Sequence, residues 1–373
     1  MSKRFNQRMS KRVIISGGGT GGHIYPAIAI ANALKEIEPG IEILFVGALG
    51  KMEMEKVPRA GYEIIGLPIV GIKREVSLDN LAFPFKLSQS LWKARAVIKD
   101  FKPDVAVGVG GFASGPLLMI ASLLGIPTLI QEQNSYAGIT NKLLARKASK
   151  ICVAYPGMEA FFPKEKIKVY GNPVRNDIVD VTSRRKEALE YFGFEEGRKT
   201  LFVMGGSLGA KSINESLNAG IASLVQDGYQ VLWQTGRAFI STAQATVSAL
   251  KTDAAKAFEF IYEMNLAYAV ADVVVSRAGA LSVSELCLAA KPSILIPFPF
   301  ASEDHQTKNA MNLVEREAAI FIKDSSAAEE LIPGAVNLLA DTNRQEELKT
   351  NIKKLARPTA AYDIAAEVLK LIR

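Results

Sequence analysis

Four glycine clusters are the part of this sequence best suited to bind a ligand. Each follows a short apolar run and precedes a helical pattern, at residues 17–22, 108–115, 205–209 and 278–280. Glycine allows close backbone approach, and the N-terminus of the following helix offers N–H groups and a partial positive charge. A tight turn alone could explain one such cluster. Four clusters at strand-to-helix junctions predict loops that bind phosphorylated ligands.

One histidine lies beside the first cluster. His23 is one of only two histidines, the other being His305, and it follows Gly22 where a helix is expected to start. A neutral imidazole can take a proton from a sugar hydroxyl near neutral pH, so its place beside this loop favours catalysis over a structural role. The sequence contains no Asp-x-Asp clamp for a metal. We therefore expect helix dipoles and backbone amides, without a metal or cofactor, to stabilise a leaving group.

A dinucleotide cofactor is the main alternative. Gly17, Gly19 and Gly22 match the GxGxxG pattern, but that fingerprint also needs an acid at the end of the second strand to bind the ribose. Here the second strand ends Phe45-Val46-Gly47. An NAD(P)-dependent oxidoreductase with two Rossmann units therefore stays the second choice. No Gly-Lys-Ser/Thr follows the glycines, which excludes a Walker A loop.

Glu285 has two interpretations. With Ser282 it fits a capping box, in which the carboxylate would reach back to the N-terminus of its own helix. Alternatively, Glu285 lies at the mouth of the cluster at 278–280 and accepts two hydroxyl groups of a ribose. The sequence leaves both open.

The elements that must position these residues alternate along the chain. Strands are expected at 13–16, 42–46, 105–109, 128–130, 151–155 and 168–170, and then at 201–204, 230–234, 258–261, 273–276, 293–297 and 319–322. Helical patterns separate them, which predicts an α/β fold of two Rossmann-like, doubly wound parallel-sheet domains. We expect domains at 1–175 and 176–358, with a helix over 359–373 that could pack back on the first domain.

Composition supports two globular domains and limits the partners. The chain has 373 residues, 22% charged and 49% hydrophobic, and its two cysteines lie in apolar runs, which excludes a disulfide framework. The net charge of +7 is uneven: residues 1–175 carry 24 basic and 13 acidic residues, net +11, whereas residues 176–373 are net −4. The uncharged run 105–131 is rich in glycine and proline, which favours strand, loop and helix over a membrane span.

Six ordered motifs resemble the MurG family of glycosyltransferases. They are SGGGTGGHIYPAIAIA, QEQNSYAGITNK, YGNPVR, MGGSLGA, SRAGALSVSEL and DHQTKNA, between Val13 and about Asn312. The resemblance implies a GT-B fold with the site in a cleft between two domains. It also implies an inverting transfer of N-acetylglucosamine from UDP-N-acetylglucosamine to the muramoyl 4-hydroxyl of undecaprenyl-pyrophosphoryl-muramoyl-pentapeptide, in peptidoglycan synthesis. A UDP-sugar epimerase, or a related enzyme with another acceptor, stays an alternative.

The resemblance assigns roles to matching positions. It implies that His23 is, or helps position, the general base, that Asn134 contacts the sugar, that Ile261 holds uracil through its backbone, and that Gln306 binds donor-sugar hydroxyls. Further donor contacts are implied at Thr20, Gly21, Gly22, Arg175, Ser207, Ala280, Leu281, Ser282, Val283, Ser284 and Glu285. Many members have histidine where this chain has Gln131, so no role is carried over to that position.

A lipid acceptor implies work at a membrane surface. Large apolar residues alternate with cations over 81–87 and 91–95, and a second basic cluster comprises Lys142, Arg146, Lys147 and Lys150. Such segments favour an anionic membrane, because each cation near the surface contributes about 1 kcal/mol. The alternative is an amphipathic helix packed inward on its sheet. We expect a peripheral enzyme on the cytoplasmic face of the cell membrane, and no nucleic-acid partner.

Overall fold

The computed structural model describes residues 10–71, 83–174, 178–179, 181–206 and 208–372. The chain forms two compact units, the first comprising Met1–Arg175 with Thr359–Arg373 and the second Asn176–Pro358. Two positions from the resemblance lie outside the described residues: Ser207, expected to bind phosphate, and Arg175, expected to meet the phosphates or orient the cleft. Leu81, at the start of the expected membrane segment, also lies outside them.

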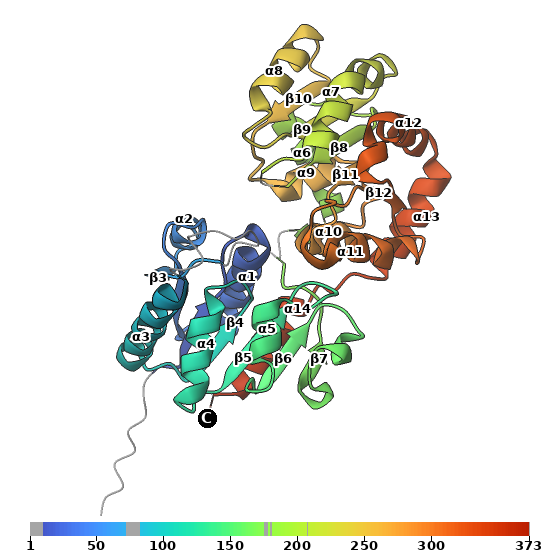
Figure 1. The fold of residues 1–373 in the computed structure, drawn as a ribbon. Helices are drawn as coiled ribbons and strands as arrows, with labels where there is room; N and C mark the ends of the chain where they lie inside the picture. The colour runs from blue at the N-terminus through green and yellow to red at the C-terminus, as the bar shows by residue number, and fades with distance from the viewer. Residues whose placement is uncertain (1–9, 72–82, 175–177, 180, 207, 373) are drawn as a thin grey trace, which may run out of the picture. The chain divides into compact units, whose positions relative to one another are not determined.

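The first unit is built on a parallel sheet (Figure 1). Its seven strands have the order β3-β2-β1-β4-β5-β6-β7. The strands are β1 (Arg12–Ser16), β2 (Glu42–Ala48), β3 (Glu63–Leu67), β4 (Val105–Gly108), β5 (Thr128–Glu132), β6 (Lys150–Val153) and β7 (Ile167–Val169). The helices between them are α1 (Gly21–Ile37), α2 (Glu53–Arg59), α3 (Phe83–Phe101), α4 (Ser114–Leu123) and α5 (Ile139–Leu144). This order, with the strands all parallel, is the doubly wound arrangement that the alternation predicted.

Helices cover both faces of this sheet. On one face α3, α4 and α5 lie side by side, and their apolar residues pack with Ile14, Val46 and Ile130. On the other face α1 packs with α14 (Ala360–Lys370), which buries Ile364 and Val368 beside strand residues. The last helix therefore belongs to the first unit.

The second unit repeats the design with six parallel strands in the order β10-β9-β8-β11-β12-β13. The strands are β8 (Thr200–Met204), β9 (Gln230–Gln234), β10 (Ala255–Phe258), β11 (Val273–Ser276), β12 (Ser293–Leu295) and β13 (Ile320–Phe321). The helices are α6 (Arg185–Phe192), α7 (Lys211–Gln226), α8 (Ile240–Ala249), α9 (Met264–Val270), α10 (Ala280–Ala289), α11 (His305–Val314), α12 (Ala327–Ala340) and α13 (Thr342–Lys353). Two clusters of buried apolar residues, one on each face of the sheet, form the core of this unit.

Two strands differ from the sequence prediction. The strand expected at 258–261 is β10 at Ala255–Phe258, because its pairing with β9 ends where Phe258 meets Gln234. Ile261 lies in the loop beyond that strand and is buried there, and a buried apolar residue in a loop has the same local pattern as one in a strand. Strand β3 was not predicted either; at this edge of the sheet Glu63 is exposed, and Ile64 and Ile65 are partly exposed.

The uncharged run 105–131 folds as β4, α4 and most of β5. Within the described part of the chain, none of the helices combines the length and the apolar composition needed to cross a bilayer.

Candidate active site

The first glycine loop holds His23 in a defined orientation. Helix α1 starts after Thr20, and His23 is its third residue. The imidazole Nδ1 lies 3.2 Å from the carbonyl oxygen of Gly18 and 3.3 Å from Oγ1 of Thr20. A carbonyl oxygen only accepts hydrogen bonds, so in the neutral imidazole Nδ1 carries the proton and donates. The lone pair that can take a proton is then on Nε2.

The second glycine loop packs against the imidazole. Gly110 and Gly111 have φ of +91° and +80°, conformations that favour glycine. A Cβ on Gly110 would lie 2.9 Å from Nε2 of His23, and one on Gly111 would lie 2.3 Å from the carbonyl oxygen of Gly18. Gly110 and Gly111 therefore do more than form a tight turn: without side chains, they let the second glycine loop approach the first one closely.

The QEQN segment is fixed by a buried carboxylate. Glu132 is 2% exposed and accepts hydrogen bonds from the amides of Asn134 (3.1 Å) and Gly138 (2.9 Å) and from Nδ2 of Asn141 (2.9 Å). Asn134 is half-buried after the carboxyl end of β5. Glu132 therefore sets the conformation of the loop that carries Asn134, a role that the sequence analysis missed.

Gln131 belongs to a buried amide cluster. Its Nε2 donates to Oδ1 of Asn172 at 3.2 Å, and Nδ2 of Asn172 donates to the carbonyl oxygen of Gln133 at 3.1 Å. Gln133 in turn donates to the carbonyl oxygen of Val109 at 2.7 Å. These bonds tie the QEQN and GNPVR motifs to the second glycine loop, at the residue directly after β4.

In the second unit, the side chain of Gln234 links two sites that the sequence predicted to bind the donor, Ile261 and the glycine loop after β8. Its Oε1 accepts from the amide of Ile261 at 2.9 Å, and its Nε2 donates to the carbonyl oxygen of Gly206 at 3.3 Å. Gly206 belongs to the glycine loop after β8, next to Ser207. Gln234 could not be predicted from local pattern, because nothing in the sequence around the end of β9 marks it as a contact.

The capping-box interpretation of Glu285 is wrong. Helix α10 starts at Ala280 after Gly279, so Ser282 lies inside the helix, and Glu285 is too far along it to cap the end. Instead, Oε2 of Glu285 accepts a hydrogen bond from the buried Tyr268 hydroxyl at 3.0 Å. Ser284 donates to the carbonyl oxygen of Ala280 at 2.9 Å, as helical serines do.

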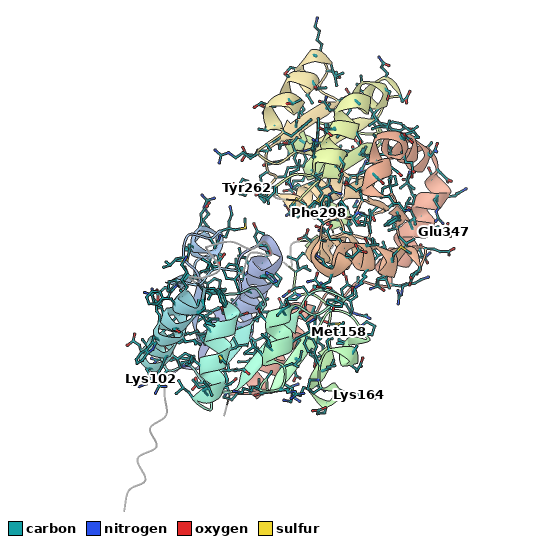
Figure 2. The ribbon with its side chains drawn as sticks, viewed as in Figure 1. Lys102, Met158, Lys164, Tyr262, Phe298 and Glu347 are labelled. Carbon is teal, nitrogen blue, oxygen red and sulfur yellow. The ribbon has the colours of Figure 1, made fainter. Side chains whose placement is uncertain are left out.

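Gln306 and Arg277 order the loop after β12. Oε1 of Gln306 accepts from the amide of Phe298 at 3.0 Å, and Phe298 is labelled in Figure 2. Arg277 is 9% exposed. Its guanidinium donates to the carbonyl oxygens of Ile296 (3.0 Å) and Pro297 (3.1 Å) and pairs with Asp324. Arg277 is a further residue that sequence reasoning missed.

Each unit thus presents glycine loops and helix N-termini at the carboxyl ends of parallel strands, where such folds bind phosphorylated ligands. Two such units in one chain define the GT-B class of glycosyltransferase fold. The described residues contain no group of three or more His, Cys, Asp or Glu side chains arranged to hold a metal ion.

Comparisons with known proteins give the family. Models of the glycosyltransferase family 28 N-terminal and C-terminal domains match residues 13–153 and 200–367. Relatives from Parabacteroides distasonis and Cytophaga hutchinsonii are 52% and 54% identical over 361 residues, which are 97% of this chain and 98% and 97% of theirs. Both are named UDP-N-acetylglucosamine–N-acetylmuramyl-(pentapeptide) pyrophosphoryl-undecaprenol N-acetylglucosamine transferase.

A crystal structure of Acinetobacter baumannii MurG is 29% identical to this chain and has a TM-score of 0.75, covering 96% of this chain and 99% of that one. The chain belongs to the MurG family of N-acetylglucosamine transferases, within glycosyltransferase family 28. The family resemblance and the GT-B fold expected from the sequence are confirmed.

Proposed function

We propose that this protein transfers N-acetylglucosamine from UDP-N-acetylglucosamine to the muramoyl 4-hydroxyl of undecaprenyl-pyrophosphoryl-muramoyl-pentapeptide. The observation that carries the proposal is the identity of 52% with a transferase of that name over 97% of this chain. The product is the disaccharide unit from which peptidoglycan is built, which links the enzyme to cell-wall synthesis, cell shape and division. An oxidoreductase is not favoured by these relatives.

His23 is the group that accepts the proton of the attacking hydroxyl. The muramoyl 4-hydroxyl attacks the anomeric carbon of the donor, the bond from that carbon to the diphosphate oxygen breaks, and UDP leaves with inversion. The hydroxyl proton passes to Nε2 of His23, since the contact with Gly18 leaves the lone pair on that nitrogen. Thr20, Gly21 and Gly22 form the adjoining loop, and Asn134 contacts the transferred sugar. Because His23 belongs to the first unit, we assign the acceptor to that unit.

The second unit holds the donor. Uracil is bound by the backbone of Ile261, whose amide donates to Gln234. The diphosphate lies at the N-terminus of α10, where backbone N–H groups and the helix dipole favour an anion. Glu285 and Gln306 bind hydroxyl groups of the ribose and the sugar. The remaining proposed donor contacts are Arg175, Ser207, Ala280, Leu281, Ser282, Val283 and Ser284.

A binding experiment separates this proposal from the dinucleotide alternative. UDP-N-acetylglucosamine and UDP are expected to raise the Tm of the full chain by several degrees, because ligand at 100 times its Kd adds about 2.7 kcal/mol to the free energy of unfolding. NAD and NADP are expected to leave the Tm unchanged. Thermal-shift titration with all four ligands measures this, and stabilisation by the dinucleotides alone would contradict the proposal.

The outer side of α3, α4 and α5 fits a membrane surface. Five large apolar side chains on these helices are more than half exposed: Phe85 (73%), Trp92 (77%), Leu123 (63%), Ile139 (71%) and Leu143 (78%). Exposed cations accompany them at Lys93, Arg95, Arg146 and Lys147. Lys142 is less available, because its ammonium lies 4.7 Å from the ring centre of Tyr136.

The two interpretations of the α3 segment are compatible. Ala94 and Ile98 pack inward on the sheet, whereas Phe85 and Trp92, seven residues apart, point outward on one side of the helix. This arrangement supports a peripheral protein that inserts aromatic side chains among lipids on the cytoplasmic face of the cell membrane.

Replacing both outward aromatic residues tests the membrane surface. The double variant Phe85→Ser with Trp92→Ser is expected to bind vesicles containing anionic lipid at least about tenfold more weakly, because each buried aromatic contributes about 1.5–3 kcal/mol. Vesicle co-sedimentation measures binding, with Tyr191→Ser on the exposed surface of α6 as the control. Equal binding of the double variant and the wild type would rule out this surface.

A further inference from the structure

Glu53 is a buried carboxylate that no part of the reaction described above uses. It is the first residue of α2, and none of its surface is exposed. Oε2 accepts a hydrogen bond from the amide of Gly19 at 3.0 Å, and Oε1 accepts one from the amide of Ala48 at 2.9 Å. A charge is buried at great cost unless it is hydrogen-bonded, so the fold stabilises this carboxylate through the two amides.

Two glycines leave room for this carboxylate. A Cβ on Gly18 would lie 2.1 Å from Oε1 of Glu53, and one on Gly47 would lie 2.5 Å from its Cγ. Neither glycine has a positive φ. Their small size, and not a special backbone conformation, is therefore what these positions require.

The carboxylate lies one peptide unit from the contacts that orient His23. Gly19 is between Gly18, whose carbonyl oxygen lies 3.2 Å from Nδ1 of His23, and Thr20, whose Oγ1 lies 3.3 Å from the same nitrogen. Gly19 has φ of +89°, so without an anchor this short segment has several accessible conformations. A hydrogen bond from its amide to a fixed carboxylate selects one of them.

We propose that Glu53 is a positioning residue for His23: it holds Gly19, and through Gly18 and Thr20 it keeps the proton of the imidazole on Nδ1. The inference rests on the proposed role of His23 as the base. The same contacts bear on the dinucleotide alternative, which needs an acidic residue at the end of β2 to bind a ribose. The carboxylate of Glu53 does reach the end of β2, but its two oxygens already accept hydrogen bonds from the amides of Gly19 and Ala48.

The test is Glu53→Gln, with Glu55→Gln as the matched control. A carboxamide keeps the shape, but its NH₂ group cannot accept a hydrogen bond, so one of the two amides loses its partner. We expect kcat to fall about 10- to 100-fold while the donor KM stays within about twofold. Glu55 is exposed on the same helix and pairs with Arg59 at 2.9 Å, so its variant is expected to keep wild-type kinetics.

A double-mutant cycle separates positioning from simple destabilisation. In a His23→Ala background, Glu53→Gln is expected to cause no further loss of kcat, since its effect passes through the imidazole. An equal loss in both backgrounds, or an unchanged kcat in the single variant, would overturn the inference. If Glu53→Gln does not fold, Gly47→Ala displaces the carboxylate while leaving its charge, and is expected to lower kcat in the same way.

A readout independent of turnover distinguishes this inference from the proposed function. The sequence has only one other histidine, His305, so NMR can follow the His23 ring nitrogens directly. In Glu53→Gln the preference for the Nδ1–H tautomer is expected to weaken. If His23→Ala kept full activity but the tautomer changed in Glu53→Gln, the role of His23 as the base would be contradicted, whereas the positioning of its ring by Glu53 would be supported. An unchanged tautomer would overturn the contact itself.

Discussion

His23→Ala is expected to lower kcat by about 10²- to 10⁴-fold, the usual contribution of a general base. The imidazole is oriented by Gly18 and Thr20, with the lone pair on Nε2. The proposed donor contacts at Ile261 and Glu285 belong to the other unit, so UDP binding is expected to remain at the wild-type level. Steady-state kinetics with a lipid-linked acceptor, together with calorimetric titration of UDP, measure both effects.

His23→Gln distinguishes a base from a group that only fills space. A glutamine amide can donate to the carbonyl oxygen of Gly18, but it cannot take a proton at neutral pH. We expect this variant to be as slow as His23→Ala. A glutamine variant with near wild-type turnover would remove His23 from the chemistry.

Glu285→Ala is expected to raise the KM for UDP-N-acetylglucosamine by about 10- to 100-fold, because hydrogen bonds to a charged group contribute about 1.5–3 kcal/mol. The carboxylate is half-buried on α10 and accepts from the Tyr268 hydroxyl, which holds one of its oxygens in place. Measured kcat at saturating donor is expected to change much less than KM.

Tyr268→Phe is the matched control for this prediction. It removes the hydroxyl that contacts Glu285 but keeps the carboxylate and the buried ring, which packs edge-on against Phe202. A donor KM within a fewfold of wild type is expected. If Glu285→Ala lowered only the Tm and left the donor KM unchanged, the carboxylate would be structural and would not contact the ribose.

Local pattern was enough to predict most of the fold. Buried β-branched runs such as those at Val13, Val105 and Val273 are strands because parallel sheets covered on both faces need apolar residues throughout. The errors lie where local pattern is ambiguous. Residues 63–67 form an edge strand that begins with a charge, and Ile261 is buried by a loop that contacts Gln234, which periodicity cannot reveal.

The site was predictable in its loops but not in its contacts. Glycine spacing indicated where backbone approaches a ligand, and His23 followed from its place beside one loop. The contact between Glu285 and Tyr268 depends on the helix starting at Ala280, two residues before the apparent capping serine. Glu53 lies 34 residues from the amide that it anchors, so only the folded chain brings the two together.

Transfer of the sugar to the lipid acceptor can be measured directly. The 373-residue chain is incubated with UDP-N-acetylglucosamine labelled in the sugar and with undecaprenyl-pyrophosphoryl-muramoyl-pentapeptide in detergent. The label is expected to enter a lipid-extractable disaccharide in a one-to-one ratio with released UDP, and only when the acceptor is present. Label that stays water-soluble, as free sugar or as an epimerised nucleotide sugar, with no gain in the lipid phase would contradict the account.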